Sequence, residues 1–368
     1  MSDPRPACLV TGTVSPYRRE PFRLLGEDQG VEVIAWREAG PPIPGLTVHR
    51  TTQAGAAQLA ASGSYRAVIC ELGGRVALPA SYAAARARGI PFVLWTGVWE
   101  HPRTLAHVLS RGLTRHLYRN ADAVATYGDH VGRHVELWRG TRGCVHVAPQ
   151  AVDVDHFGKE VPPEDRRGAR ERAGGPGTEL LVLYVGRLEE EKGVPDLLEA
   201  WGNVALGEGA RLALAGSGPL QREADRAGSG VRTLGYVARS DLPALYAAAD
   251  LLVLPSVRTA TFTEPWGLVV NEAMLQRNPV ITSDAVGAAA GCLVRDGLNG
   301  LVFPAGDAAA LEARLRALAT DPDLRERLGA CARKDAGRLT PAAWATGMGR
   351  ALVCAGAGSG KFTREPDC

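Results

Sequence analysis

The sequence lacks the features that mark several large classes of protein. None of its runs approaches the roughly 20 apolar residues that a membrane-spanning helix needs. Its first segment, MSDPRPACLVTG, has no apolar core of the kind found in signal peptides. The formal net charge is only +2 over 368 residues, which is not typical of a polyanion-binding protein. We therefore expect a soluble, cytoplasmic protein with no nucleic-acid partner.

The cysteines also lack a pattern. The chain has seven of them, with neither a CxxC pair nor a cluster with histidine. An odd number without a pattern argues against both a disulfide framework and a zinc site. We therefore expect reduced thiols at all seven positions, which are Cys8, Cys70, Cys144, Cys292, Cys331, Cys354 and Cys368.

The segment after the first apolar run lacks the GxGxxG pattern of dinucleotide-binding enzymes, since it reads TGTVSP at 11–16. This absence argues against a nicotinamide-dependent oxidoreductase. No lysine stands out as the site of a covalently bound cofactor, which argues against a glycan phosphorylase. We expect no cofactor.

What is present is a regular alternation of short apolar runs with helical segments. Hydrophobic residues make up 45% and charged residues 22% of the chain, which is typical of a globular protein. Near-continuous apolar strands that alternate with helices indicate parallel sheets covered on both faces. The expected strands are 7–12, 31–36, 67–72, 91–97, 123–128, 144–150, 179–187, 210–218, 231–237, 249–256, 278–284 and 300–306. The expected helices are 79–89, 102–121, 193–202, 240–248, 267–276, 307–328 and 341–356.

A polar stretch divides the alternation into two halves. Residues 158–178, GKEVPPEDRRGARERAGGPGT, are rich in Gly, Pro and charge and read as a linker. We therefore expect an α/β protein of two Rossmann-like domains, 1–160 and 161–340. A last segment, 341–368, holds a helix that packs back on the first domain and a tail, 359–368, without a core pattern.

The second half holds cations directly after its first strand. VGRLEEEKG, at 185–193, contains Gly186, Arg187 and Lys192. Ligands of open α/β sheets bind at the carboxyl ends of the strands, and two cations there suit a phosphate or diphosphate. The alternative is a solvated turn in which these cations pair with Glu189, Glu190 and Glu191.

Two acids in an apolar stretch are the second signal. TFTEPWGLVVNEAM, at 261–274, places Glu264 before a helix that begins near Trp266–Gly267, and Glu272 inside that helix. The helix N-terminus is a phosphate site, and each carboxylate can accept hydrogen bonds from vicinal hydroxyls. This set fits a nucleotide sugar. The alternative is a first-turn acid that interacts with the helix dipole and an exposed helical glutamate.

Two further strand ends are weaker signals. LAGSGP carries Gly216 and Gly218, and LGYV carries Tyr236 and Val237. Both could leave backbone groups free to contact a ligand, the second of them a flat base. Ordinary tight turns are the alternative.

Taken in this order and spacing, these motifs resemble the retaining glycosyltransferases of the GT-B fold, family 4, also called the group 1 transferases. The resemblance covers about 179–306. It implies two Rossmann-like domains that face each other across a cleft, and that Arg187 and Lys192 bind the donor diphosphate. It implies that Glu264 contacts the donor sugar, and that Glu272 holds the ribose. It adds Pro265, Trp266, Gly267 and Leu268 as donor-binding residues, with the amides of Gly267 and Leu268 on the phosphate.

The first half resembles the acceptor domain of this family more loosely. Gly12 lies where relatives often have a Gly-rich loop that contacts the donor. His101, with Glu100 beside it, lies at a strand end where relatives often carry a histidine of the cleft. A surface His–Pro turn is the alternative for His101.

DVD, at 153–155, matches a metal-binding motif of the other glycosyltransferase fold. Arg187 and Lys192 already supply positive charge for a diphosphate. We therefore interpret Asp153 and Asp155 as residues of an interdomain hinge and expect no metal.

A basic row recurs every fourth residue on the helix expected at 102–121, opposite a row of leucines. It is either a solvated face or a surface for anionic lipid or an anionic acceptor. The basic row consists of Arg103, His107, Arg111, Arg115 and Arg119, and the leucines are Leu105, Leu109 and Leu113.

The sequence thus predicts a transferase that moves a sugar from a nucleoside-diphosphate sugar to an acceptor hydroxyl, with retention of anomeric configuration. The expected acceptor is a lipid-linked glycan or a small natural product. Weak peripheral contact with the inner face of a membrane is part of this hypothesis. A sugar-nucleotide epimerase of the same fold and an inactive nucleotide-sugar-binding protein are the alternatives.

Overall fold

The computed structural model of the chain describes residues 3–228 and 230–358 and divides them into two compact units. Unit 1 consists of 3–101, 105–151 and 340–358, and unit 2 of 102–104 and 152–339. The chain therefore leaves unit 1 after Ala151 and returns to it at Thr340. The expected tail, 359–368, lies outside the described residues.

Unit 1 is built on a parallel sheet of seven strands in the order β3-β2-β1-β4-β5-β6-β7. Most of its strands are apolar along their whole length because both faces of the sheet are covered. The strands are β1 Ala7–Thr13, β2 Val31–Glu38, β3 Val48–Arg50, β4 Val68–Glu71, β5 Phe92–Thr96, β6 Ala123–Thr126 and β7 Val145–Val147.

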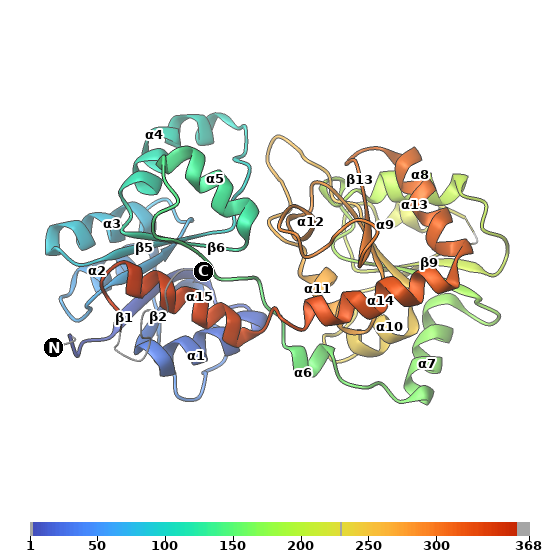
Figure 1. Ribbon diagram of the computed structural model, residues 1–368, viewed down its shortest axis with the longest axis horizontal. Helices are drawn as coiled ribbons and strands as arrows, with labels where there is room; N and C mark the ends of the chain where they lie inside the picture. Colours follow the sequence, from blue (N-terminus) through green and yellow to red (C-terminus); the bar gives the residue numbers. More distant parts are fainter. Residues whose placement is uncertain (1–2, 229, 359–368) are drawn as a thin grey trace. The chain divides into compact units, whose positions relative to one another are not determined.

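Helices cover both faces of this sheet, as Figure 1 shows. The helices are η1 Pro16–Arg18, α1 Arg19–Gln29, α2 Gln53–Ala61, α3 Ala77–Arg88, α4 Leu105–Asn120, α5 Asp129–Arg139 and α15 Pro341–Cys354. On one face α1 packs beside α15, where the rings of Phe22 and Trp344 lie 5.4 Å apart. On the other face lie α2, α3, α4 and α5. The last helix of the chain thus completes the core of unit 1.

Unit 2 repeats this plan with a parallel sheet of six strands in the order β10-β9-β8-β11-β12-β13. Its strands are β8 Leu180–Val185, β9 Ala210–Ala215, β10 Val231–Gly235, β11 Leu251–Leu254, β12 Val280–Ser283 and β13 Gly300–Phe303. The strand order reverses at β8, and the crevice at such a point, beyond the carboxyl ends of the strands, is where open α/β sheets bind ligands. The predicted fold class is confirmed in both units.

The helices of unit 2 also form two layers. They are α6 Val154–Phe157, α7 Pro163–Gly174, η2 Glu190–Lys192, α8 Val194–Asn203, α9 Gln221–Ala224, α10 Leu242–Ala248, α11 Leu268–Leu275, α12 Gly287–Ala290, α13 Ala308–Thr320 and α14 Pro322–Ala336. One layer contains α8 and α13, whose leucines pack on the sheet. The other contains α7, α10 and α11.

Two expectations about these helices are wrong. The stretch at 158–178 is not only a linker, because α7 forms inside it and buries Ala169 and Ala173 against the unit. The single helix expected at 307–328 is two helices. Asp321 separates them, because it accepts a hydrogen bond from the amide of Leu324 and so caps α14.

The expectation of reduced cysteines is also wrong. Cys144, just before β7, forms a disulfide with Cys354 at the end of α15. The sequence gives no hint of this pair because the two residues lie 210 positions apart. Among the described cysteines, Cys8, Cys70, Cys292 and Cys331 are free thiols.

Figure 1 shows the helices of both units as short segments. In the part of the chain that the structure describes, none of them combines the length and the apolar character needed to cross a membrane.

Candidate active site

The tips of β8 and β9 interlock through glycines. The amide of Gly186 donates to the carbonyl of Ala215 at 3.0 Å, and a Cβ on Gly216 would lie 1.8 Å from the carbonyl oxygen of Gly186. A Cβ on Gly218 would lie 2.3 Å from the carbonyl oxygen of Leu188. These glycines are therefore required for the close approach of the two loops. Whether Gly186, Gly216 and Gly218 also contact a donor stays a prediction.

Lys192 and Glu264, which the sequence places 72 positions apart, are in direct contact. The Lys192 ammonium forms an ion pair with Oε2 of Glu264, and the two side chains are only 14% and 10% exposed. Ser256 donates to the same oxygen at 3.1 Å, and the ammonium lies 4.6 Å from the centre of the Phe262 ring. Ser256 and Phe262 both follow β11, as Glu264 does, so their place after a strand was the available signal for them.

Backbone contacts fix Lys192 against this loop. Gly193, which follows Lys192, has a φ of 69°, and a Cβ there would lie 1.9 Å from the carbonyl oxygen of Pro255. The amide of Val257 donates to the carbonyl of Glu191 at 3.0 Å. The segment after β8 and the segment after β11 are therefore in direct backbone contact at the strand tips.

Arg187 adopts the alternative arrangement, in which the cation pairs with acids of its own loop. Its guanidinium pairs with Glu189 at 2.6 Å and with Glu191 at 2.8 Å, and its side chain is 58% exposed. Its backbone carbonyl is held by the hydroxyl of Tyr184 at 2.6 Å. Lys192 instead reaches across to Glu264. The two predicted diphosphate ligands thus differ: Lys192 is enclosed, whereas Arg187 lies in solvent with its charge balanced by two acids.

The helix predicted after Glu264 is α11, which begins at Leu268. Gly267 precedes it with a φ of 91°, and a Cβ there would lie 2.6 Å from Cδ2 of Leu254. Gly267, at the N-cap position, has no side chain with which to cap this N-terminus. The amide of Val270 donates to the carbonyl of Gly267 at 3.0 Å, whereas among the described residues the amides of Leu268 and Val269 have no hydrogen-bond partner. These two amides are therefore available to an anion.

The loop before α11 is held by α12. The amide of Gly287 donates to the carbonyl of Glu264 at 3.1 Å, and a Cβ on Gly287 would lie 2.0 Å from the carbonyl oxygen of Pro265. Trp266 is buried and donates through Nε1 to Asn271 at 2.8 Å. Pro265 and Trp266 therefore help to fix the position of Glu264 and of the start of α11. Their predicted contact with the donor stays a prediction.

Glu272 lies in the second turn of α11. Tyr246 donates its hydroxyl to Oε2 of Glu272 at 2.7 Å. Burial raises the pKa of Glu272 to about 7, although the Tyr246 hydrogen bond and the charge of Arg239 act in the opposite direction. The exposed-glutamate alternative is not what the structure shows. Tyr246 was missed because nothing in its local sequence links it to a residue 26 positions away.

The raised pKa of Glu272 predicts that donor affinity falls as the pH is lowered through 7. Below that pH the carboxyl is protonated and can no longer accept two hydrogen bonds as an anion, which we expect to weaken binding by about tenfold. A titration of nucleotide binding between pH 5.5 and 8.5 measures this. In Glu272→Gln the affinity for the nucleotide should be low and should not change with pH. A wild-type affinity that does not change between pH 6 and 8 would contradict the ribose role.

In unit 1 the amide of Gly12 is already used. It donates to Oε1 of Glu71 at 2.5 Å, and Glu71 also accepts from Thr11 at 2.6 Å and pairs with Arg18 at 3.2 Å. Arg18 lies 4.5 Å above the ring of Trp95. Sequence reasoning missed Glu71 and Arg18, although an acid at the end of a strand is the same signal as in unit 2. Donor contact by Gly12 stays a prediction.

His101 packs in an aromatic cluster of unit 1. Its ring lies 5.9 Å from Tyr118 on α4, and 5.0 and 5.4 Å from His134 and Trp138 on α5. Burial, and after it the charge of His134, lowers the pKa of His101 to about 4. The imidazole is therefore neutral at pH 7. Its catalytic role stays a prediction.

Asp155 lies in the short helix α6, and Asp153 immediately precedes this helix. Asp153 caps this helix by accepting from the amide of His156 at 3.0 Å, and it pairs with Arg239 at 3.1 Å. In residues 3–228 and 230–358, no three His, Cys, Asp or Glu side chains gather as metal ligands.

The part of the chain that contains these strand tips resembles a known protein family. Residues 165–335 match the model of the family described as glycosyl transferases group 1, and this range contains Arg187, Lys192, Glu264 and Glu272. Residues 165–335 are thus similar to the group 1 glycosyl transferases. The resemblance to this group that was drawn from the motifs is thereby confirmed.

Named relatives of this chain are glycosyltransferases. Alpha-D-kanosaminyltransferase of Streptomyces kanamyceticus is 28% identical over 269 residues, which cover 67% of this chain and 66% of the relative. D-inositol 3-phosphate glycosyltransferase of Geodermatophilus obscurus is 36% identical over 233 residues, which cover 59% and 49%. The chain thus spans between about half and two thirds of the length of these relatives.

Solved structures confirm the GT-B fold over both units. The Anabaena protein HepE, solved with UDP and glucose, has a TM-score of 0.75 at 19% identity and covers 95% of this chain and 99% of its own. Sucrose-phosphate synthase from Thermosynechococcus elongatus has a TM-score of 0.70 at 20% identity, with 94% and 98% covered. At these identities the likeness is one of fold.

Proposed function

We propose that the protein is a retaining glycosyltransferase that moves a sugar from a nucleoside-diphosphate sugar to an acceptor hydroxyl. The observation that carries the proposal is the enclosed Lys192–Glu264 pair beside the uncapped N-terminus of α11. A cation and free amides suit a diphosphate, and the adjacent acid suits sugar hydroxyls. Support also comes from HepE, whose solved complexes contain UDP, glucose and UDP-glucose.

Donor binding in this proposal exchanges protein ion pairs for contacts with the substrate. Lys192 turns from Glu264 to the diphosphate, and Glu264 then accepts hydrogen bonds from the sugar. Charge that builds on the leaving diphosphate is stabilised by Lys192, by Arg187 and by the amide of Leu268, as in an oxyanion site. These groups supply the positive charge that a metal ion would otherwise provide, so the proposed reaction needs no metal.

The rest of the donor lies along the strand tips. Glu272 accepts from the ribose, and the backbone of Tyr236 and Val237 contacts the base. With retention, the departing phosphate oxygen accepts the proton of the acceptor hydroxyl on the same face of the sugar. No side-chain base is then required. His101, neutral at pH 7, would position the acceptor.

A thermal-shift panel of UDP, GDP, ADP and dTDP tests the donor class. We expect one of them to raise the melting temperature, since a ligand at 100 times its dissociation constant stabilises the folded state by about 2.7 kcal/mol. Lys192→Ala should abolish the shift. Stabilisation by none of the four would contradict the proposal. Analysis of the product with the matching sugar donor then separates transfer from epimerisation, and proton NMR of the anomeric centre reports retention.

A leucine row on α4 bears on where the enzyme acts. The leucines opposite the basic row are exposed: Leu105 by 75% and Leu109 by 77%, with Val108 and Leu113 beside them. Arg111 lies on the same exposed part of the helix. An apolar row next to arginines is complementary to an anionic lipid surface. We propose that α4 contacts the membrane peripherally on its cytoplasmic side, where the acceptor would be a lipid-linked glycan.

Co-sedimentation with phosphatidylglycerol vesicles tests this contact. We expect binding that weakens in Leu105→Gln/Leu109→Gln and at high salt, since buried apolar area and screened charge both contribute. Leu137→Gln, which alters an exposed leucine of α5, is the matched control. Equal binding by all three proteins, or none by the wild type, would leave the acceptor a soluble compound.

A further inference from the structure

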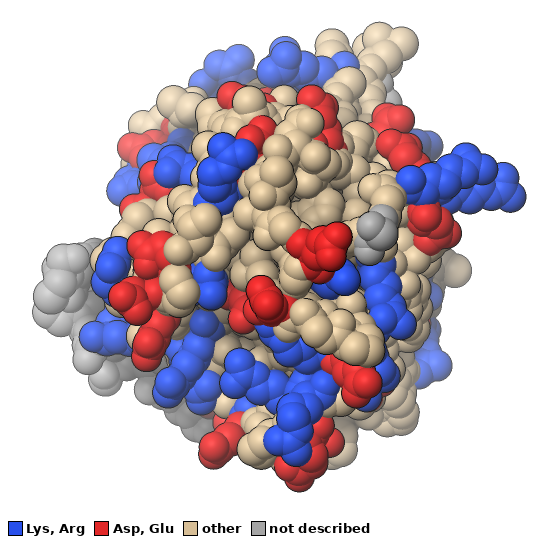
Figure 2. Space-filling view, turned by 90° about the vertical axis from the view of Figure 1, so that its right-hand side faces the viewer, with Lys and Arg blue, Asp and Glu red and all other residues tan. Residues whose placement is uncertain are grey.

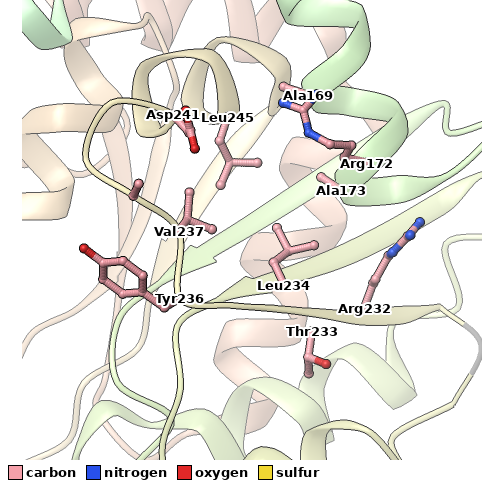
Figure 3. Close-up of a pocket in the computed structure, with 11 residues that line it drawn as sticks. Ala169, Arg172, Ala173, Arg232, Thr233, Leu234, Tyr236, Val237, Asp241 and Leu245 are labelled. Atoms are coloured by element: carbon pink, nitrogen blue, oxygen red, sulfur yellow. The ribbon is translucent and has the colours of Figure 1, made fainter.

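A hollow of about 570 Å³ lies on one face of the sheet of unit 2, beside its edge strand β10 and between α7 and α10. Small-molecule sites commonly occupy roughly 300–1,000 Å³. Figure 3 shows the side chains around this hollow, which we call the β10 hollow. Its apolar floor consists of Ala169, Ala173, Leu234, Val237 and Leu245.

The floor is incompletely covered by protein. Leu245 is buried, but Leu234 and Val237 are each partly exposed. The side chain of Leu234, on β10, and that of Val237, just after β10, are therefore partly open to solvent. Covering them with the apolar part of a ligand is favourable, at about 25 cal/mol per Å².

The rim of the β10 hollow carries two guanidinium groups. Arg172 comes from α7 and Arg232 from β10, and both lie on the same side of the hollow, whereas Asp241 lies on the other side (Figure 3). Among the described residues, neither arginine has a hydrogen-bond or ion-pair partner. Arg170 on the same helix differs, because it pairs with Asp250 at 2.8 Å.

The charge of the rim comes from its own side chains. Figure 2 shows Lys and Arg side chains interspersed with Asp and Glu over the face that it presents. At the β10 hollow, Arg172 and Arg232 outnumber the single acid, Asp241. A ligand drawn to this rim therefore carries negative charge.

The β10 hollow is separate from the proposed donor site. The donor residues lie at the tips of β8, β9 and β11, whereas Arg232 lies near the start of β10. The two sites share only the segment that follows β10, which contains Tyr236 and Val237. Tyr236 is 82% exposed and lies at the opposite end of the hollow from Arg232 (Figure 3).

We propose that the β10 hollow binds a small organic phosphate that acts as an effector of donor binding. Its phosphate lies between Arg172 and Arg232, and its apolar part covers Leu234 and Val237. The effector role rests on the proposed function, in which Tyr236 and Val237 contact the base of the donor. A ligand that orders this segment raises the affinity for the donor, and by linkage the donor raises the affinity for the ligand by the same factor.

Calorimetric titration of the full chain with phenyl phosphate tests the binding site. We expect saturable binding that Arg172→Gln and Arg232→Gln each weaken by about tenfold, since each removes a charged donor of hydrogen bonds to the phosphate of the ligand. Arg226→Gln, an exposed arginine outside the hollow, is the matched control and should bind as the wild type does. Inorganic phosphate and benzyl alcohol should each bind more weakly than phenyl phosphate. Absence of binding, or equal binding by all four proteins, would overturn the proposal.

A second titration tests the effector role. With phenyl phosphate at saturation, we expect the nucleotide found in the thermal-shift panel to bind several-fold more tightly. Displacement of phenyl phosphate by the nucleotide would show that the hollow is part of the donor site and would overturn the proposal. Should no nucleotide bind at all, the proposed function fails and the effector role with it, while the phenyl phosphate titration still decides the binding site.

Discussion

Replacement of Lys192 by alanine lowers the rate of sugar transfer by about 10²–10³-fold, the size of effect seen when one oxyanion-site donor is removed. Lys192 is the enclosed cation at the strand tips, so its charge is less screened by water than that of an exposed residue. The change also leaves Glu264 without its cation, which we expect to lower stability. The measurement is kcat/KM for the donor at fixed acceptor, alongside the melting temperature.

Three controls separate these effects. Lys334→Ala removes an exposed lysine of α14 and should change neither activity nor stability. Lys192→Ala/Glu264→Ala removes both charges and should be more stable than Lys192→Ala alone, because the acid is removed together with the lysine that it pairs with. Arg187→Ala should lower activity with little loss of stability, since Arg187 is exposed. Full activity in both Lys192→Ala and Arg187→Ala would remove the diphosphate assignment.

Gly216→Ala should destabilise unit 2 by about 2–5 kcal/mol, from the sum of a strained backbone and a steric clash. The φ of Gly216 is 144°, and its new Cβ would lie 1.8 Å from the carbonyl oxygen of Gly186. Relief of this clash must separate the tips of β8 and β9, so donor binding should fall as well. Urea unfolding followed by circular dichroism measures the change in stability.

Gly202→Ala is the matched control for this change. Gly202 lies near the end of α8 with a negative φ, and a Cβ there meets no atom within 4 Å. Alanine at this position should leave stability unchanged or raise it slightly, since alanine is the better helix former. A melting temperature for Gly216→Ala equal to that of Gly202→Ala would show that the two loops separate without cost.

The strands were predictable from the sequence because a strand buried on both faces needs apolar residues along its whole length. The segment 180–185, LLVLYV, satisfies this requirement, since all six of its residues are apolar and buried. The short strand β3, with the sequence VHR, carries no such signal. The helix α7 was missed because its charged residues and glycines resemble a linker. It is helical because Ala169 and Ala173, one turn apart, find a surface to pack on.

The proximity of Lys192 and Glu264 was predictable because β8 and β11 are neighbours and ligand-binding residues follow strands at one edge. The hydrogen-bond and ion-pair partners of the individual side chains were not predictable from the sequence. Arg187 pairs with Glu189 and Glu191, and Gly12 with Glu71, because the nearest opposite charge or free acceptor depends on loop conformation. These partners are determined by tertiary contacts, about which a short sequence motif carries no information.

The disulfide between Cys144 and Cys354 has a topological consequence. The chain leaves unit 1 after Ala151 and re-enters it at Thr340, so this bond closes a covalent ring that contains all of 152–339. A protease cut anywhere inside that ring would leave α15 attached to the rest of its own unit. Unit 2 is thus an insert within a scaffold that remains joined at both ends.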